Sequence, residues 1–161
     1  MSGPYEEIFA GEVAARTAPG ARHELICARL HAIVRASVAN FTSTRLLASR
    51  TQVRVTEGTI LCPDLALVAT ATGKLWLAAE IVNSDDHHTD TVVKKQIYEQ
   101  VKVPRLWMID PRYDNVEVYC CTEYGLMLKS ILTGQEILAE KLLPEFQLAV
   151  ADLFAASSPN N

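Results

Sequence analysis

The sequence predicts an α/β domain built on a central mixed β-sheet flanked by helices. Apolar runs of strand length alternate along the chain with two segments whose apolar residues recur at helical spacing. Hydrophobic residues make up 49% of the 161 residues, which is ordinary for a globular protein with one hydrophobic core. We therefore expect one domain over residues 5–154 and a frayed tail over residues 155–161.

A hairpin and a long helix are predicted at the start of the chain. Residues 5–17 alternate loosely in polarity around Gly11, which favours a short hairpin or an irregular strand. A helix is predicted after Gly20 and ends near Asn40, because apolar residues recur at a spacing of three to four. These apolar residues are Ile26, Leu30, Ile33, Val34 and Val38.

The rest of the chain is predicted to form strands around one further helix. Residues 90–102 predict a helix of about three turns, with Thr89 or Asp90 as its N-cap. Its apolar face consists of Val93, Ile97 and Val101. The predicted strands lie within residues 45–55, 61–82, 105–110, 115–121 and 124–132, and residues 143–154 close the fold with a final helical turn.

Composition and charge exclude several classes of protein. A net charge of −4 excludes a generally basic protein that coats DNA, since such binding needs many cations. No apolar run approaches the roughly 20 residues of a membrane span, and the N-terminus has neither the basic nor the apolar region of a signal peptide. The four cysteines form no CxxC pair, which favours a reducing cytoplasm.

Two acidic residues, Asp64 and Glu80, stand within the apolar segment 61–82. Carboxylates are rarely buried without a partner, because the loss of hydration is costly. The connection TATGK between the two strands fits a three-residue hairpin loop with Gly73 in the left-handed region. In this register the numbers of paired residues sum to 144, so Asp64 lies opposite Glu80 and the two carboxylates could hold one divalent cation.

Two alternatives stay open on these residues alone. A two-residue loop would shift the pairing by one residue and place the two acids on opposite faces of the sheet. Alternatively, Asp64 lies in water at a strand end while Glu80 pairs with a lysine. A third charged group near the acids favours the metal site.

The helix predicted at residues 90–102 offers such a group. Val82 occupies the next position on the face of Glu80, so the strand itself supplies no cation. Lys94 and Tyr98 form an i, i+4 pair beside the apolar face, from which a lysine can extend its ammonium to the carboxylates. An Asp-Glu-Lys cluster suits Mg²⁺-assisted hydrolysis of a phosphodiester, in which the lysine orients a water or stabilises developing charge.

These residues resemble the PD-(D/E)XK nuclease superfamily, and further motifs are similar to the Uma-two family of putative restriction endonucleases. The family carries an E-V-x-S segment, then D-x-x-x-K-x-x-x-Y, then V-P-x-x-W-x-x-D-P, after an N-terminal Gly-Glu segment and a helix headed by His. The corresponding residues here are Tyr5, Gly11, Glu12, His23, Pro63, Asp64, Glu80, Asp90, Lys94, Tyr98, Val103, Pro104, Trp107, Asp110 and Pro111. Asn83 departs from the pattern, because the family often has Ser there.

The resemblance implies a restriction-endonuclease-like fold and a DNA endonuclease that uses Mg²⁺ or Mn²⁺. It implies that Asp64 and Glu80 hold the metal, and that Lys94 is the catalytic lysine, moved from the strand to the following helix. It also implies that Glu12 and His23 lie at the edge of the site. A homodimer is a further expectation, because small nucleases of this kind often cut two strands with two copies.

Other polar and aromatic residues have simpler interpretations. The segment DDHHTD, residues 85–90, is interpreted as a solvated loop, with a substrate or second-metal contact and a zinc site as alternatives. Cys27 and His31 are interpreted as structural, and Trp76 and Trp107 as core or interface aromatics. Five arginines are interpreted as scattered and solvated rather than as a rim that faces phosphate: Arg16, Arg22, Arg45, Arg50 and Arg54.

Two functions follow from these observations. The first is a metal-dependent endonuclease that hydrolyses DNA phosphodiester bonds. The alternative is a catalytically silent domain that keeps the nuclease fold as a binding or assembly module, which the acidic net charge favours.

Overall fold

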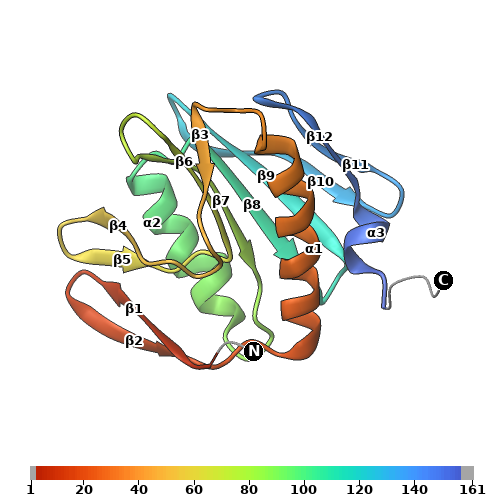
Figure 1. Ribbon diagram of the computed structural model, residues 1–161. Coiled ribbons are helices and arrows are strands. Elements are labelled where there is room, and N and C mark those ends of the chain that lie inside the picture. Colours follow the sequence, from red (N-terminus) through yellow and green to blue (C-terminus); the bar gives the residue numbers. More distant parts are fainter. Residues whose placement is uncertain (1–2, 157–161) are drawn as a thin grey trace.

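The computed structural model describes residues 3–156 and has a six-stranded mixed sheet at its centre (Figure 1). The strand order is β10-β9-β8-β7-β6-β3, in which β7 and β8 run parallel and all other neighbours run antiparallel. The strands are β3 (Thr44–Leu46), β6 (Leu65–Ala69), β7 (Leu75–Ile81), β8 (Arg105–Asp110), β9 (Asn115–Thr122) and β10 (Gly125–Thr133). The predicted α/β fold with a central mixed sheet is confirmed.

Helices cover both faces of this sheet, because the side chains of each strand alternate between two hydrophobic cores. The helix α1 (Ala21–Val38) shares one core with Leu67 of β6. On the other face, Tyr98 of α2 (Lys95–Gln100) shares the second core with Val68 of β6. As predicted, the buried residues of α1 include Ile26, Leu30, Val34 and Val38.

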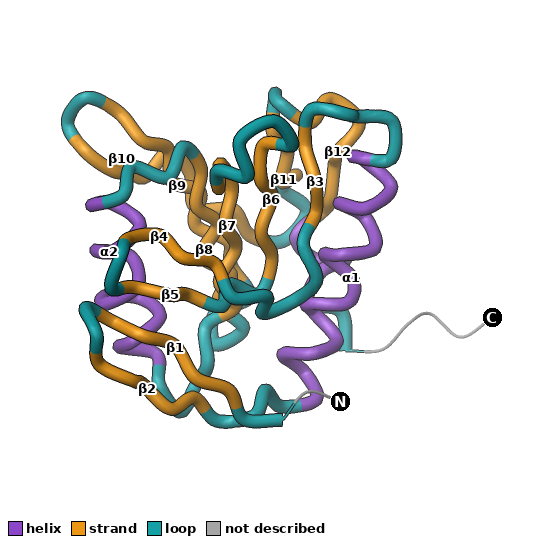
Figure 2. The backbone as a smooth tube through the Cα atoms, turned by 60° about the vertical axis from the view of Figure 1, so that its left-hand side comes forward, coloured by secondary structure: helices purple, strands orange, loops and turns teal. Residues whose placement is uncertain are grey.

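A second sheet of four strands lies beside α2 (Figure 2). Its order is β2-β1-β5-β4, with β1 (Tyr5–Phe9), β2 (Glu12–Arg16), β4 (Val53–Thr56) and β5 (Thr59–Leu61). Ala10 and Gly11 join β1 to β2 with φ angles of 51° and 85°, the backbone of a tight two-residue hairpin turn. The predicted N-terminal hairpin is confirmed, and it carries Glu7 into the interior, where that residue is fully buried.

The chain closes with a hairpin and a helical turn. These are β11 (Ile137–Glu140), β12 (Leu143–Ala149) and α3 (Val150–Phe154). Phe146 of β12 stacks on Trp107 of β8 with ring centroids 5.3 Å apart, in the core that α1 covers. The predicted final helical turn is confirmed. No helix within residues 3–156 is long and apolar enough to cross a membrane.

The loop between β6 and β7 differs from the predicted one. The Ala69 N–H donates to the Lys74 carbonyl at 2.9 Å, which leaves four residues, 70–73, in the loop. Gly73 closes the loop with φ 70°, in the left-handed region as predicted. The predicted three-residue loop is therefore wrong.

A β-bulge restores the predicted register beyond this loop. Val68 pairs with Leu75, whereas Leu67 pairs with Leu77, so Trp76 is the extra residue of the bulge. From Leu67 back to the start of β6, the numbers of paired residues sum to 144 as predicted. One step beyond the pair of Leu65 and Ala79, this register places Asp64 opposite Glu80, so the two acids lie on one face of the sheet.

The helix predicted at residues 90–102 is a single helix over residues 87–100 that contains a π-helical stretch, η1 (Thr89–Lys94). Its fully buried side chains are polar, at positions Asp90, Lys94 and Tyr98. The predicted N-cap is wrong, because the helix starts earlier and Asp90 points into the protein. The predicted apolar face is only half-buried: Val93, Ile97 and Val101.

Candidate active site

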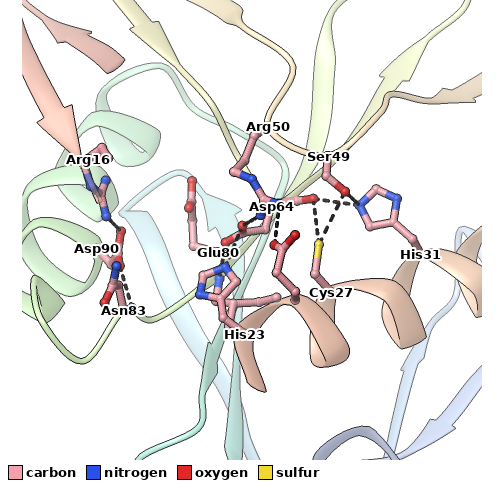
Figure 3. Close-up of polar contacts among 12 residues, drawn as sticks. Arg16, His23, Cys27, His31, Ser49, Arg50, Asp64, Glu80, Asn83 and Asp90 are labelled. Carbon is pink, nitrogen blue, oxygen red and sulfur yellow. Dashed lines mark hydrogen bonds and ion pairs between the residues drawn. The ribbon is translucent and has the colours of Figure 1, made fainter. Parts of the chain in front are cut away.

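Asp64 and Glu80 lie side by side on the face of the sheet that α2 covers. Their neighbours Ala66 and Ala78 pair with each other and belong to the core on that face. Asp64 is 3% exposed and Glu80 is 2% exposed, and Figure 3 shows the two side chains in one cluster. The structure therefore favours the predicted register over the shifted one, and it contradicts the placement of Asp64 in water, although Glu80 does pair with a lysine, Lys94.

The carboxylate of Asp64 accepts three hydrogen bonds. Oδ1 lies 2.9 Å from His23 Nε2 and 2.8 Å from Arg50 Nη1. Oδ2 accepts from the Ile81 N–H at 2.8 Å. Burial raises the pKa of Asp64, but other effects are larger. The hydrogen bond and the charge of His23, together with the hydrogen bond from the Ile81 N–H, lower the pKa of Asp64. Asp64 is therefore a fixed, ionised carboxylate.

The carboxylate of Glu80 contacts the helix that follows β7. Its Oε1 lies 2.6 Å from Lys94 Nζ and 2.5 Å from the Tyr98 hydroxyl. Burial raises the pKa of Glu80 to about 8, since the nearby Glu7 and Asp64 carboxylates add to the effect and Lys94 only partly offsets it. Burial and Glu80 also raise the pKa of Tyr98, so its hydroxyl stays protonated and donates.

Lys94 reaches a second carboxylate, that of Glu7, which the sequence did not single out. The ammonium lies 2.8 Å from Glu7 Oε2, and the lysine side chain is completely buried. Burial disfavours its charge, but Glu80, Glu7 and Asp90 outweigh burial and raise the pKa of Lys94. Glu7 Oε2 also accepts from the Cys62 N–H at 2.7 Å. Lys94 therefore contacts two carboxylates, those of Glu80 and Glu7.

Arg16 extends this network to the loop after β7. Its guanidinium contacts Glu7 Oε1 at 2.5 Å and Asp90 Oδ1 at 2.6 Å. Asp90 Oδ2 accepts from the Asn83 N–H at 2.8 Å, which ties the loop to the helix (Figure 3). Arg16 and Arg50 have side chains only 3% and 7% exposed. The interpretation of these two arginines as solvated is therefore wrong.

The main chain of Asp64 is supported from α1. His31 Nε2 lies 2.7 Å from the Asp64 carbonyl oxygen, and Cys27 Sγ lies 3.6 Å from the same atom. Ser49 Oγ contacts His31 Nε2 at 3.1 Å and Cys27 Sγ at 3.4 Å. This agrees with the structural interpretation of Cys27 and His31, whereas His23, at the start of the same helix, reaches the carboxylate itself.

Glu12 is the candidate that the structure does not bring to the site. It is exposed at the turn end of the β1–β2 hairpin, and the buried acid of this hairpin is Glu7. His87 and His88 are exposed, and residues 3–156 contain no group of three or more His, Cys, Asp or Glu residues placed to hold a metal. The solvated-loop interpretation holds for these histidines, but Asp90 at the end of the segment is buried.

Each of the two acids keeps an oxygen whose lone pairs are not all used by hydrogen bonds or ion pairs. An ionised carboxylate offers about four lone-pair positions. Asp64 uses both positions of Oδ1 and one of Oδ2, and Glu80 accepts both of its bonds at Oε1. Mg²⁺ is commonly held by one or two carboxylates and keeps several waters. Asp64 Oδ2 and Glu80 Oε2 are therefore the oxygens of the two acids that, by their chemistry, could bind a Mg²⁺ or Mn²⁺ ion.

A cleft of about 520 Å³ opens next to His23, which bonds to Asp64. Val82, which follows the end of β7, also lines the cleft, whereas Asp64 and Glu80 do not. The volume lies within the range of about 300–1,000 Å³ typical of ligand pockets. The cleft is lined by Ala18, Gly20, Ala21, Arg22, His23, Val82, Asn83, Ser84, Asp85, Pro111 and Arg112.

By its architecture the chain is a nuclease-like α/β protein. A solved structure from Anabaena variabilis, described as "a putative nuclease belonging to DUF820", matches with a TM-score of 0.78 at 16% identity, over 94% of this chain and 90% of that chain. At this identity the match shows a shared fold. The family model Uma2, described as "Putative restriction endonuclease", matches residues 2–151, and the chain belongs to this family. None of the curated proteins compared with the chain matches it. The predicted family is confirmed.

Proposed function

We propose that the protein is an endonuclease that hydrolyses DNA phosphodiester bonds with Mg²⁺ or Mn²⁺. The observation that carries the proposal is the position of Asp64 and Glu80 side by side on one face of the sheet, each with unused lone pairs, and with the Asp64 partner His23 in the wall of an open cleft. Membership of the Uma2 family supports it. The cytoplasmic location and the homodimer remain predictions.

The residues of the site have distinct roles in this proposal. Asp64 and Glu80 hold the ion, which when bound supplies Lewis-acid stabilisation of charge on the phosphate and a more acidic water. Lys94 is completely buried between two carboxylates and therefore fixes Glu80 rather than contacting the substrate. His23 holds Asp64 and lies in the wall of the cleft, where it faces the reacting phosphate.

The proposal is tested by incubating plasmid DNA and single-stranded DNA with the purified protein and Mg²⁺ or Mn²⁺. We expect cleavage by the wild type and its loss in Asp64→Ala and Glu80→Ala. Glu145→Ala, which changes an exposed acid on β12, is the matched control and should cut like the wild type. Cleavage that is unchanged in both Asp64→Ala and Glu80→Ala would contradict the proposal.

The second candidate function is a silent nuclease-fold module. It is favoured by the cations that already contact the buried acids without a metal: Lys94, Arg16 and Arg50. Calorimetric titration with Mn²⁺ separates the two functions. Binding that is lost in Asp64→Asn supports the nuclease, and no binding at millimolar Mn²⁺ supports the silent module.

A further inference from the structure

Arg50 bridges two carboxylates at the edge of the site. Its Nη1 lies 2.8 Å from Asp64 Oδ1 and its Nη2 lies 2.5 Å from Glu24 Oε1, while its side chain is only 7% exposed. A guanidinium is always protonated in proteins, so Arg50 places a fixed positive charge between the two carboxylates, as a bound cation would.

The two oxygens of Asp64 face different partners. Oδ2 accepts from the Ile81 N–H, next to Glu80 on β7, whereas Oδ1 accepts from Arg50 and His23 (Figure 3). Two-metal sites hold their ions about 3.5–4 Å apart. One carboxylate joins two such ions by offering one oxygen to each. Because both positions of Oδ1 are filled, Asp64 can offer only Oδ2 to a metal.

The backbone around Arg50 fixes its position. Its φ of 56° lies in the left-handed region, which residues other than glycine seldom adopt. The Arg50 N–H donates to the Pro63 carbonyl at 2.9 Å, directly before Asp64 in the chain. The preceding residue, Ser49, contacts His31 of α1 at 3.1 Å. The guanidinium is therefore a fixed part of the site.

We propose that the site binds a single divalent cation, between Asp64 and Glu80, and that Arg50 occupies the position of a second one. The inference rests on the proposed function, because it concerns the same metal site. Arg50 acts through Asp64 and is therefore a positioning residue: it leaves Oδ2 to the metal and keeps a second ion away from Oδ1.

Calorimetric titration of the full chain with MnCl₂ tests this stoichiometry. We expect one Mn²⁺ per chain in the wild type and in Arg50→Lys, and two in Arg50→Gln, where the charge between the two acids is lost. Arg45→Gln, which changes an exposed arginine on β3, is the matched control and should bind one ion. Two ions in the wild type, or one in a folded Arg50→Gln, would overturn the inference. No binding in the wild type would instead overturn the proposed function.

Electron paramagnetic resonance gives a second test, in which the wild-type spectrum is informative by itself. With excess Mn²⁺, the wild type should show the spectrum of isolated bound ions, whereas Arg50→Gln should show the coupling of two ions about 4 Å apart. Circular dichroism establishes that Arg50→Gln is folded. Where that variant does not fold, the wild-type spectrum alone decides, and coupled ions in it would contradict the inference.

Discussion

Asp64 and Glu80 are neighbours on one face of the sheet, yet their partners give them opposite properties. Asp64 accepts hydrogen bonds from His23, Arg50 and a backbone N–H, and its pKa is lowered. Glu80 has fewer donors and lies near other carboxylates, so its pKa is raised to about 8. In the metal-free protein at neutral pH, the proton of the pair therefore resides on Glu80.

This difference predicts how pH changes the stability of the metal-free protein. Because the folded-state pKa of Glu80 lies above its ordinary value, the stability it contributes is complete below about pH 4.5 and is lost as the pH rises through about 8. The loss is at most about 1.4 kcal/mol per pH unit. We expect the melting temperature of the wild type in EDTA to fall between pH 5.5 and pH 7.5, and to fall less in Glu80→Gln.

The comparison has a matched control in Glu145→Gln, an exposed acid on β12 whose melting temperatures should follow the wild type at both pH values. For a chain of this size, about 1 kcal/mol corresponds to roughly 3 °C. An identical change of melting temperature in wild type and Glu80→Gln would show that Glu80 does not carry the proton.

The sequence could predict the residues of this site that lie on regular elements near one another in the chain. Asp64 and Glu80 follow from strand alternation and hairpin register, and Lys94 follows from helical spacing on the next element. The predicted loop between β6 and β7 has the wrong length. The predicted register is nevertheless correct because Trp76 forms a bulge, which no local pattern in the sequence indicates. Sequence periodicity therefore located the acids but could not prove their register.

At the scale of elements, the β1–β2 hairpin completes the site from a separate sheet. It supplies Glu7, which contacts Lys94, and Arg16, which contacts both Glu7 and Asp90. The contacts with Lys94 and Asp90 join residues far apart in the chain: Arg16 and Asp90, for example, are 74 positions apart. Glu6 and Glu7 are adjacent and look equivalent in the sequence, so only the twist and pairing of the hairpin decide which one is buried.

The same contacts predict a strong stability effect at Glu7. Glu7→Gln removes the charge that balances Lys94 and Arg16, and breaking a buried ion pair in this way typically costs about 3–5 kcal/mol. We expect urea unfolding at pH 7 to show a loss of this size. Glu6→Gln, on the exposed side of the same strand, should change stability by less than about 0.5 kcal/mol. Equal effects of the two variants would contradict the buried network.

The helix at residues 87–100 shows why the burial of a polar helix face was harder to predict. A helix that packs on a core normally buries an apolar stripe, so Val93 and Ile97 were expected to face inward. The side chains that are buried instead are Asp90, Lys94 and Tyr98, because each finds a charged or polar partner inside. Polarity alone cannot identify such a stripe, since its partners come from other elements.

At the scale of the whole molecule, the proposed function requires a protein with a net charge of −4 to bind an anionic polymer, which only local features can achieve. The cleft next to His23 has two arginines in its wall, Arg22 and Arg112. Arg22 contacts Asp114 at 2.6 Å, with both side chains more than half exposed. Exposed pairs of this kind contribute little to stability, so a DNA phosphate can take the place of Asp114.

Arg22 therefore provides a test of the cleft as the DNA-binding surface. If Arg22 contacts one phosphate, Arg22→Ala should weaken DNA binding several-fold and reduce the slope of log K against log salt concentration by about 1. Fluorescence anisotropy in EDTA, which prevents cleavage, measures both quantities over a salt series. Arg45→Ala removes an exposed arginine outside the cleft and should leave the slope unchanged, because it changes the net charge equally without losing that contact. If both variants reduce the slope equally, DNA responds to net charge alone, and the cleft is not its binding site.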